Sequence, residues 1–164
     1  MQNINPPLTS ACCPQCGASR EISEERCPSC NAKGLYVKNL TVRHLVEERF
    51  LEKVGEEDYY LCMNPECDVA YYNNVAVFLK DHLKVPIWFK RDANPKYVCY
   101  CSKVKEDDVI KAVLQGDAST IEDICRITGA MSKYECEVNN PTGNCCYNII
   151  KEVLERALVL RNSK

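Results

Sequence analysis

The pattern of apolar and polar positions differs between the two halves of the chain. In residues 40–55, LTVRHLVEERFLEKVG, apolar residues recur at nearly helical spacing. This spacing predicts a single helix, with Thr41 as its N-cap and Gly55 at its end. The next apolar runs are shorter and rich in aromatic and β-branched residues, which is typical of strands. The strands expected from these runs cover residues 58–62, 68–72, 75–80 and 85–90.

The pattern becomes helical after a polar stretch, KRDANPK at residues 90–96, which we interpret as a linker. Helices are expected over residues 105–117, 119–129 and 146–160. Ser119 and Glu122 have the spacing of a capping box, and Asn144 is a candidate N-cap for the last helix. The fold class is therefore expected to be α+β: an antiparallel sheet with one helix over residues 1–92, then a small helical domain over residues 93–164.

Composition and charge narrow the function classes. The chain has 164 residues, of which 46% are hydrophobic and 27% are charged, as in a folded soluble protein. The net charge of −2, without a basic run, argues against a nucleic-acid partner. No apolar stretch approaches the roughly 20 residues of a membrane span, so we expect no membrane insertion. The first residues, MQNINPPLTSACC, lack the pattern of a signal peptide, so a cytoplasmic protein is expected.

Cysteine is the unusual component, with 13 residues, most of them in short-spaced sets. In a reducing compartment such sets are typical of metal ligands rather than disulfides. Only two histidines are present, and no nucleophile triad, phosphate loop or dinucleotide motif is recognisable. A classical active site is therefore not expected, and any enzymatic role would be limited to electron transfer or metal-ion reduction.

Three cysteine pairs in the first half predict a zinc site. A C-x2-C turn presents both sulfurs to one tetrahedral ion, and two such turns, CPQCG and CPSCN, follow each other closely. A third pair, C-x4-C, lies between two predicted strands. Cys13 and Cys16 are expected to bind zinc, completed either by Cys62 and Cys67 or by Cys27 and Cys30.

A second set lies at the predicted helix starts, where unpaired N–H groups favour thiolate over thiol. Its members are Cys99, Cys101, Cys136, Cys145 and Cys146. The C-x-C spacing of the first two is atypical of structural zinc and favours a [2Fe–2S] cluster. Cys146 begins the last helix and is preferred as a ligand, with Cys145 as the alternative.

Several motifs together resemble the N-terminal region of archaeal CopZ-type copper chaperones over about residues 12–155. They are CCPQCG, YYLCMNPECDVAYY, YVCYCSKVKEDDVIKAV, STIEDI and CEVNNPTGNCC. The C-terminal set of cysteines also resembles the [2Fe–2S] domain of bacterioferritin-associated ferredoxins. The resemblance implies a zinc module that uses Cys13, Cys16, Cys62 and Cys67. It also implies a [2Fe–2S] cluster bound by Cys99, Cys101, Cys136 and Cys146.

The function that this resemblance implies is one-electron transfer in copper homeostasis, with Cu(II) reduced to Cu(I). A redox protein, a metal-transport ATPase and the copper ion are the expected partners. No Met-x-Cys-x-x-Cys copper loop is present, which argues against copper delivery by this chain alone. The alternative is a zinc-ribbon module for protein interaction, in which every cysteine site is structural.

Overall fold

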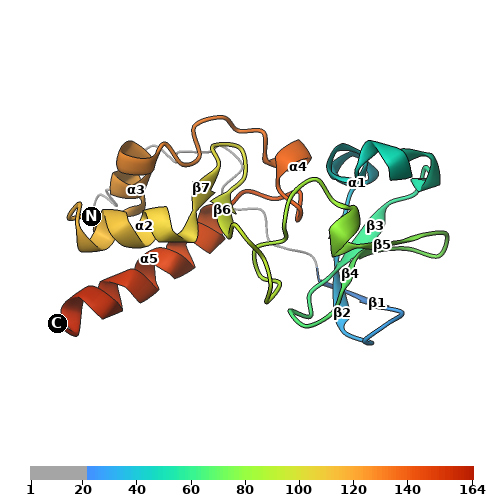
Figure 1. Cartoon of the computed structure of the whole chain (residues 1–164), viewed down its shortest axis with the longest axis horizontal. Helices are drawn as coiled ribbons and strands as arrows, with labels where there is room; N and C mark the ends of the chain where they lie inside the picture. Colours follow the sequence, from blue (N-terminus) through green and yellow to red (C-terminus); the bar gives the residue numbers. More distant parts are fainter. Residues whose placement is uncertain (1–21) are drawn as a thin grey trace, which may run out of the picture.

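The computed structural model describes residues 22–164. Figure 1 shows two parts side by side, a sheet with α1 in one and α2, α3 and α5 in the other. The fold is thus α+β, as expected. Within the described residues, no helix is both long and apolar enough to cross a membrane.

The sheet of the first part is an antiparallel meander whose spatial order follows the chain order. Its core contains large side chains from β2, β3, β4 and β5, including Tyr59 and Tyr71, together with Val42 and Val46. The described strands are β1 (Ile22–Arg26), β2 (Lys33–Val37), β3 (Tyr59–Cys62), β4 (Val69–Tyr72) and β5 (Val77–Leu79). The three strands predicted between residues 58 and 80 are confirmed, whereas β1 and β2 were not predicted.

The prediction of a single helix over residues 40–55 is wrong. The chain forms α1 (Asn39–Leu45) and then a separate 3-10 helix, η1 (Glu48–Lys53). Between them Val46 is extended and pairs with Leu83 in an isolated bridge. The backbone N–H of Glu47 also donates to His82, at 2.9 Å. These bonds to a distant segment replace helical hydrogen bonds, which local spacing cannot reveal.

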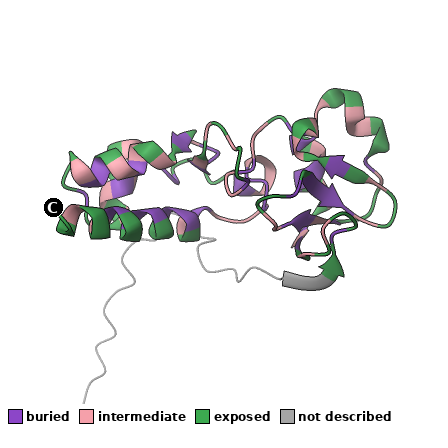
Figure 2. Cartoon of the chain, turned by 60° about the horizontal axis from the view of Figure 1, so that its bottom comes forward, coloured by how far each residue is buried: buried purple, intermediate pink, exposed green. Residues whose placement is uncertain are grey.

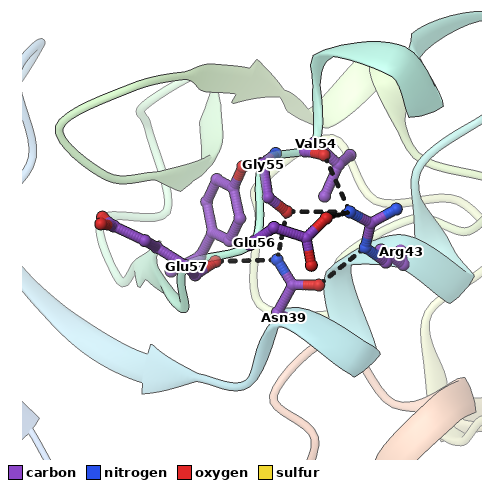
Figure 3. Close-up of polar contacts among 7 residues, drawn as sticks. Asn39, Arg43, Val54, Gly55, Glu56 and Glu57 are labelled. Carbon is purple, nitrogen blue, oxygen red and sulfur yellow. Dashed lines mark hydrogen bonds and ion pairs between the residues drawn. The ribbon is translucent and has the colours of Figure 1, made fainter.

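Polar side chains of α1 fix the loop that returns from η1 to β3 (Figure 3). The Asn39 amide donates to the carbonyls of Gly55 and Glu57, at 2.7 and 2.8 Å. Arg43 donates to the carbonyls of Val54 and Gly55 at 3.1 and 3.0 Å, and to Asn39 Oδ1 at 2.8 Å. The carbonyls of Val54, Gly55 and Glu57 therefore all have side-chain donors from α1, which fix the loop that leads into β3.

Two further expectations for this part are corrected. Thr41 lies inside α1, which begins after Lys38, and its hydroxyl donates to Glu137 O instead of capping the helix. Residues 85–90 form irregular structure with a turn at Trp88 and Phe89 rather than a strand. A 3-10 turn, η2 (Lys80–His82), precedes them, and Lys90 N donates to Ile87 O at 2.9 Å.

The second part packs its helices around one apolar core. Figure 2 shows the buried residues of α5 along one side of the helix and exposed residues along the other. Ile149, Ile150, Val153, Leu154 and Ala157 form this buried face. The elements are β6 (Tyr97–Cys99), β7 (Val104–Lys105), α2 (Glu106–Leu114), α3 (Ile121–Thr128), α4 (Cys136–Asn139) and α5 (Tyr147–Asn162). The three predicted helices are confirmed, and β6, β7 and α4 were not predicted.

The helix ends differ from the predicted caps. Thr120 is the N-cap of α3, and its hydroxyl accepts from Asp123 N at 3.2 Å, so the capping box lies one residue after the predicted pair Ser119 and Glu122. Gly129 ends this helix in the left-handed conformation, φ 76°. Asn144 does not cap α5, because Cys146 occupies that position.

Candidate metal centres

The strand order brings four cysteines together at one end of the sheet. In an antiparallel meander the β1–β2 and β3–β4 turns lie at the same end, and Gly34 pairs with Cys62 across β2 and β3. Cys27 and Cys30 come from the first turn, and Cys62 and Cys67 flank the second. We call these four residues the sheet site. Their sulfurs all lie within 4.8 Å of one another.

The spacing of these sulfurs fits a tetrahedral zinc ion. Zn–S bonds of about 2.3 Å at tetrahedral angles place the sulfurs about 3.8 Å apart. The Sγ atoms of Cys27 and Cys67 are 3.9 Å apart, and those of Cys30 and Cys62 are 3.5 Å apart. Three of the four cysteines are buried, so water is largely excluded from the group. The donor set and its geometry therefore suit structural zinc.

Backbone hydrogen bonds shape both turns as knuckles. Asn31 N donates to Cys27 O at 2.9 Å, and Asn31 has a positive φ of 60°. In the other turn Cys67 N donates to Asn64 O at 3.2 Å, and the Asn64 side chain accepts from Glu66 N at 3.0 Å. Asparagine is suited to both places, because it tolerates left-handed backbone and caps its own turn.

The thiols of Cys27, Cys30 and Cys62 differ in pKa. Burial raises the pKa of Cys62, although the nearby Lys90 ammonium acts in the opposite direction. Burial also raises the pKa of Cys27. Burial acts on Cys30 too, but hydrogen bonds from the Ala32 backbone and the Asn64 side chain outweigh it and lower its pKa to about 6. Cys30 is thus a thiolate at neutral pH, and a metal ion binding here would displace protons from its neighbours.

The sheet site combines pairs that the sequence analysis did not join. Both of its alternatives included Cys13 and Cys16, which lie outside the described residues, so their role stays a prediction. The structure brings the pair Cys27 and Cys30 to the third pair instead. The sequence signal that could have found this was the unpredicted strand β2, which puts the two turns at one end of the sheet.

The five cysteines of the C-terminal set gather where β6, α4 and α5 meet. We call Cys99, Cys101, Cys136, Cys145 and Cys146 the helix site. The sulfurs of Cys136, Cys145 and Cys146 lie within 4.8 Å of one another. Cys101 Sγ lies 3.8 Å from Cys136 Sγ. Cys99 is joined to the group through a hydrogen bond with Cys146. The structure therefore brings together all the cysteines predicted for this site.

Hydrogen bonds favour two thiolates in the helix site. The Cys146 thiol and the Met131 N–H lower the pKa of Cys99 to about 5, against the effect of burial. The Cys136 thiol lowers the pKa of Cys101 to about 7. The pKa values of Cys136 and Cys146 are raised in turn, because their protons are held by the neighbouring sulfurs. Thiolates are the form that binds iron and zinc.

Two N–H donors reach the sulfurs of the helix site, and a third buried donor lies in the loop before Cys146. Met131 N lies 3.4 Å from Cys99 Sγ, and Asn139 Nδ2 lies 3.9 Å from Cys101 Sγ. Asn140 is 1% exposed, and its Nδ2 has no hydrogen-bond partner within the described residues. Its Oδ1 accepts from Thr142, which fixes the orientation of the amide. The donors from Met131 and Asn139 suit the thiolates of an iron–sulfur cluster. The buried Asn140 donor is in the same loop and needs an acceptor.

Both loops of the helix site are anchored on the first part of the chain. Tyr100, between Cys99 and Cys101, donates to Pro86 O at 2.7 Å and accepts from Trp88 N at 2.9 Å. The loop from Cys136 to Cys146 is bonded to the sheet part by two buried hydroxyls, each at 2.6 Å. Thr41 donates to Glu137 O, and Tyr71 donates to Pro141 O. Sequence reasoning missed these anchors, because nothing in their spacing marks them.

Replacing Tyr71 with phenylalanine is expected to destabilise the protein by about 1–3 kcal/mol, because the buried Pro141 carbonyl loses its donor. Urea unfolding measures this loss. Tyr60→Phe is the matched control, since Tyr60 lies on the neighbouring strand and packs against Tyr36 and Tyr72. An equal loss in both variants would show that the contact with the loop contributes nothing.

The first part of the chain is similar to a known class of zinc-binding domain. Residues 24–84 match a family model described as the zinc binding domain of CopZ. This range includes all four cysteines of the sheet site and excludes Cys13 and Cys16.

Two relatives then extend the likeness beyond that range. The chain is 38% identical over 123 residues to the copper chaperone CopZ of Archaeoglobus fulgidus, covering 74% of this chain and 58% of that protein. The X-ray structure of the N-terminal domain of Archaeoglobus fulgidus CopZ matches with a TM-score of 0.69 and 35% identity. It covers 79% of this chain and 97% of that domain. The chain belongs to the family of the CopZ N-terminal domain, and it spans less than two thirds of the length of the copper chaperone.

Proposed function

We propose that this chain is a two-site metalloprotein of copper homeostasis, with structural zinc in the sheet site and a [2Fe–2S] cluster in the helix site. The observation that carries the proposal is the gathering of nine cysteines into two separate groups, each with a distinct set of neighbours. The relative named as a copper chaperone makes the copper ion the substrate that we favour. A copper-transporting protein and a redox protein are the corresponding partners.

The proposed roles, structural for the sheet site and electron transfer for the helix site, follow from the chemistry of zinc and iron. Zinc has no redox chemistry, so the sheet site serves the fold. A [2Fe–2S] cluster exchanges single electrons, which is the change that turns Cu(II) into Cu(I). The helix site is supported in this role by its buried thiolates and by the donors from Met131 and Asn139. Zinc in the helix site is the less favoured occupant, because the C-x-C spacing is atypical of zinc.

Two domains are part of this proposal, with a boundary at residue 92. Separate apolar cores support it. One core is formed by residues between Leu35 and Ile87, and the other by residues between Val98 and Ala157. The loops described above, from Tyr100 and from Cys136 to Cys146, would join the two domains in one unit.

A visible absorption spectrum of anaerobically purified protein, before and after dithionite, tests the proposal. We expect sulfide-to-iron bands that bleach on reduction, about two irons and one zinc per chain, and faster reduction of added Cu(II) by the dithionite-reduced protein than by protein with serine at Cys99. A colourless protein that contains zinc alone would refute electron transfer and leave a zinc module for protein interaction.

A further inference from the structure

Lys90 is a fully buried lysine outside both cysteine groups, with an exposed fraction of 1%. It is the last residue of the predicted strand 85–90, which the structure does not form, and the first residue of the predicted linker. Burying a lysine is costly unless its charge is balanced and its three donors are satisfied. The side chain of Lys90 therefore requires an explanation beyond packing.

The contacts of Lys90 lie on the knuckle between Cys62 and Cys67. Its Nζ donates to Asn64 O at 2.8 Å and to Val69 O at 3.0 Å, so it bridges the two ends of this turn. Its neighbour Arg91 adds a backbone bond to Pro65 O at 3.1 Å and an ion pair with Glu66 at 2.6 Å. Residues 90–91 thus bind the knuckle along its whole length.

The electrostatic environment of Lys90 includes the sheet site. Burial lowers the pKa of Lys90, and the charges of Cys62, Cys67, Cys27 and Cys30 act in the opposite direction. The Asp92 carboxylate also interacts with the Lys90 ammonium. The hydrogen-bond partners of Lys90 are carbonyls, which are neutral. Four thiolates around one Zn²⁺ carry a net charge of about −2, and a buried cation beside them offsets part of it. The proposed charge balance concerns the zinc-loaded site, because the tetrathiolate with its metal ion carries this net negative charge.

We propose that Lys90 is a positioning residue of the sheet site, which holds the Cys62–Cys67 knuckle and balances the negative charge of a zinc tetrathiolate. This inference rests on the proposed zinc site. Because residues around a metal's ligands commonly contribute 10- to 100-fold to its affinity, the loss of Lys90 is expected to weaken zinc binding by about that factor.

The test uses Lys90→Met, which removes the charge, and Lys90→Gln, which removes the charge but keeps a donor for one carbonyl. Zinc affinity of the reduced full chain is measured by competition with a chromophoric chelator, and the signal of the sheet site is the one that Cys27→Ser abolishes. Urea unfolding of each variant is measured with and without zinc. Both variants are expected to bind zinc about 10- to 100-fold more weakly and to lose more stability in the zinc-loaded than in the metal-free form.

The matched control is Lys84→Met, because the Lys84 ammonium also donates to a carbonyl, that of His44, at 3.0 Å, and is exposed. It should bind zinc as the unmodified chain does. Equal losses of stability with and without zinc, including failure to fold in both states, would show a merely structural role and overturn the inference. Wild-type zinc binding that survives Cys27→Ser unchanged would instead refute the zinc site itself, and the inference with it.

Discussion

Cys27→Ser is expected to lower the zinc content from about one ion per chain to nearly none, whereas Cys13→Ser leaves it unchanged. The Cys27 sulfur is buried 3.9 Å from Cys67 Sγ, inside a group of four that already has tetrahedral spacing. A serine hydroxyl does not replace a thiolate as a zinc ligand. Metal analysis of both purified variants gives the result directly.

The same substitution should unfold the knuckle end of the sheet. The apolar cluster there consists of Cys27, Cys62 and Cys67 with Val69 and Tyr72, so the ligands themselves form most of it. Structural zinc contributes an apparent 10–16 kcal/mol in small peptides, and a large part of this is lost with one ligand. We expect the thermal midpoint, followed by circular dichroism, to fall by at least about 10 °C.

Cys125→Ser is the matched control for both measurements, because Cys125 lies on α3 and packs against the core of the second part. It should keep its zinc and its midpoint nearly unchanged. Zinc retained by Cys27→Ser and lost from Cys13→Ser would return the site to the pairs that the sequence analysis favoured.

The C-terminal helices could be predicted because their signal is local. Apolar residues of α5 recur at i, i+3 and i+4, and the residues from Ile149 to Ala157 on that stripe are buried in the structure. The same reasoning failed for residues 40–55, where the spacing is also nearly helical. There the chain leaves the helix at Val46 to pair with Leu83, and a contact across that distance leaves no periodic mark.

The sequence predicted which cysteines belong to the candidate sites, but not which cysteine pairs come together in one site. Short cysteine spacings identified every member of the two groups, yet they did not reveal which turns share an end of the sheet. That depends on β2, whose sequence KGLYV is short and carries a glycine. The supporting residues gave no signal at all, because a buried lysine such as Lys90 looks in sequence like any other residue of a polar linker.

Cys146→Ser is expected to abolish most of the visible absorption of the iron-loaded protein, and Cys145→Ser to preserve it. Distance alone does not distinguish the two, since both sulfurs lie within 4.8 Å of Cys136 Sγ. Burial and the bond to Cys99 do distinguish them. Cys146 is 1% exposed and its thiol bonds with Cys99 as well as with Cys136. Cys145 is partly exposed and bonds with Cys136 and Cys146.

The adjacency of the two cysteines makes them a closely matched pair for this experiment. Each substitution removes one thiol just before α5, so a general effect on the helix start would change both spectra alike. We expect iron content and absorption to fall together in Cys146→Ser only. The opposite result would assign the fourth ligand to Cys145 and require α5 to start with that sulfur turned inward.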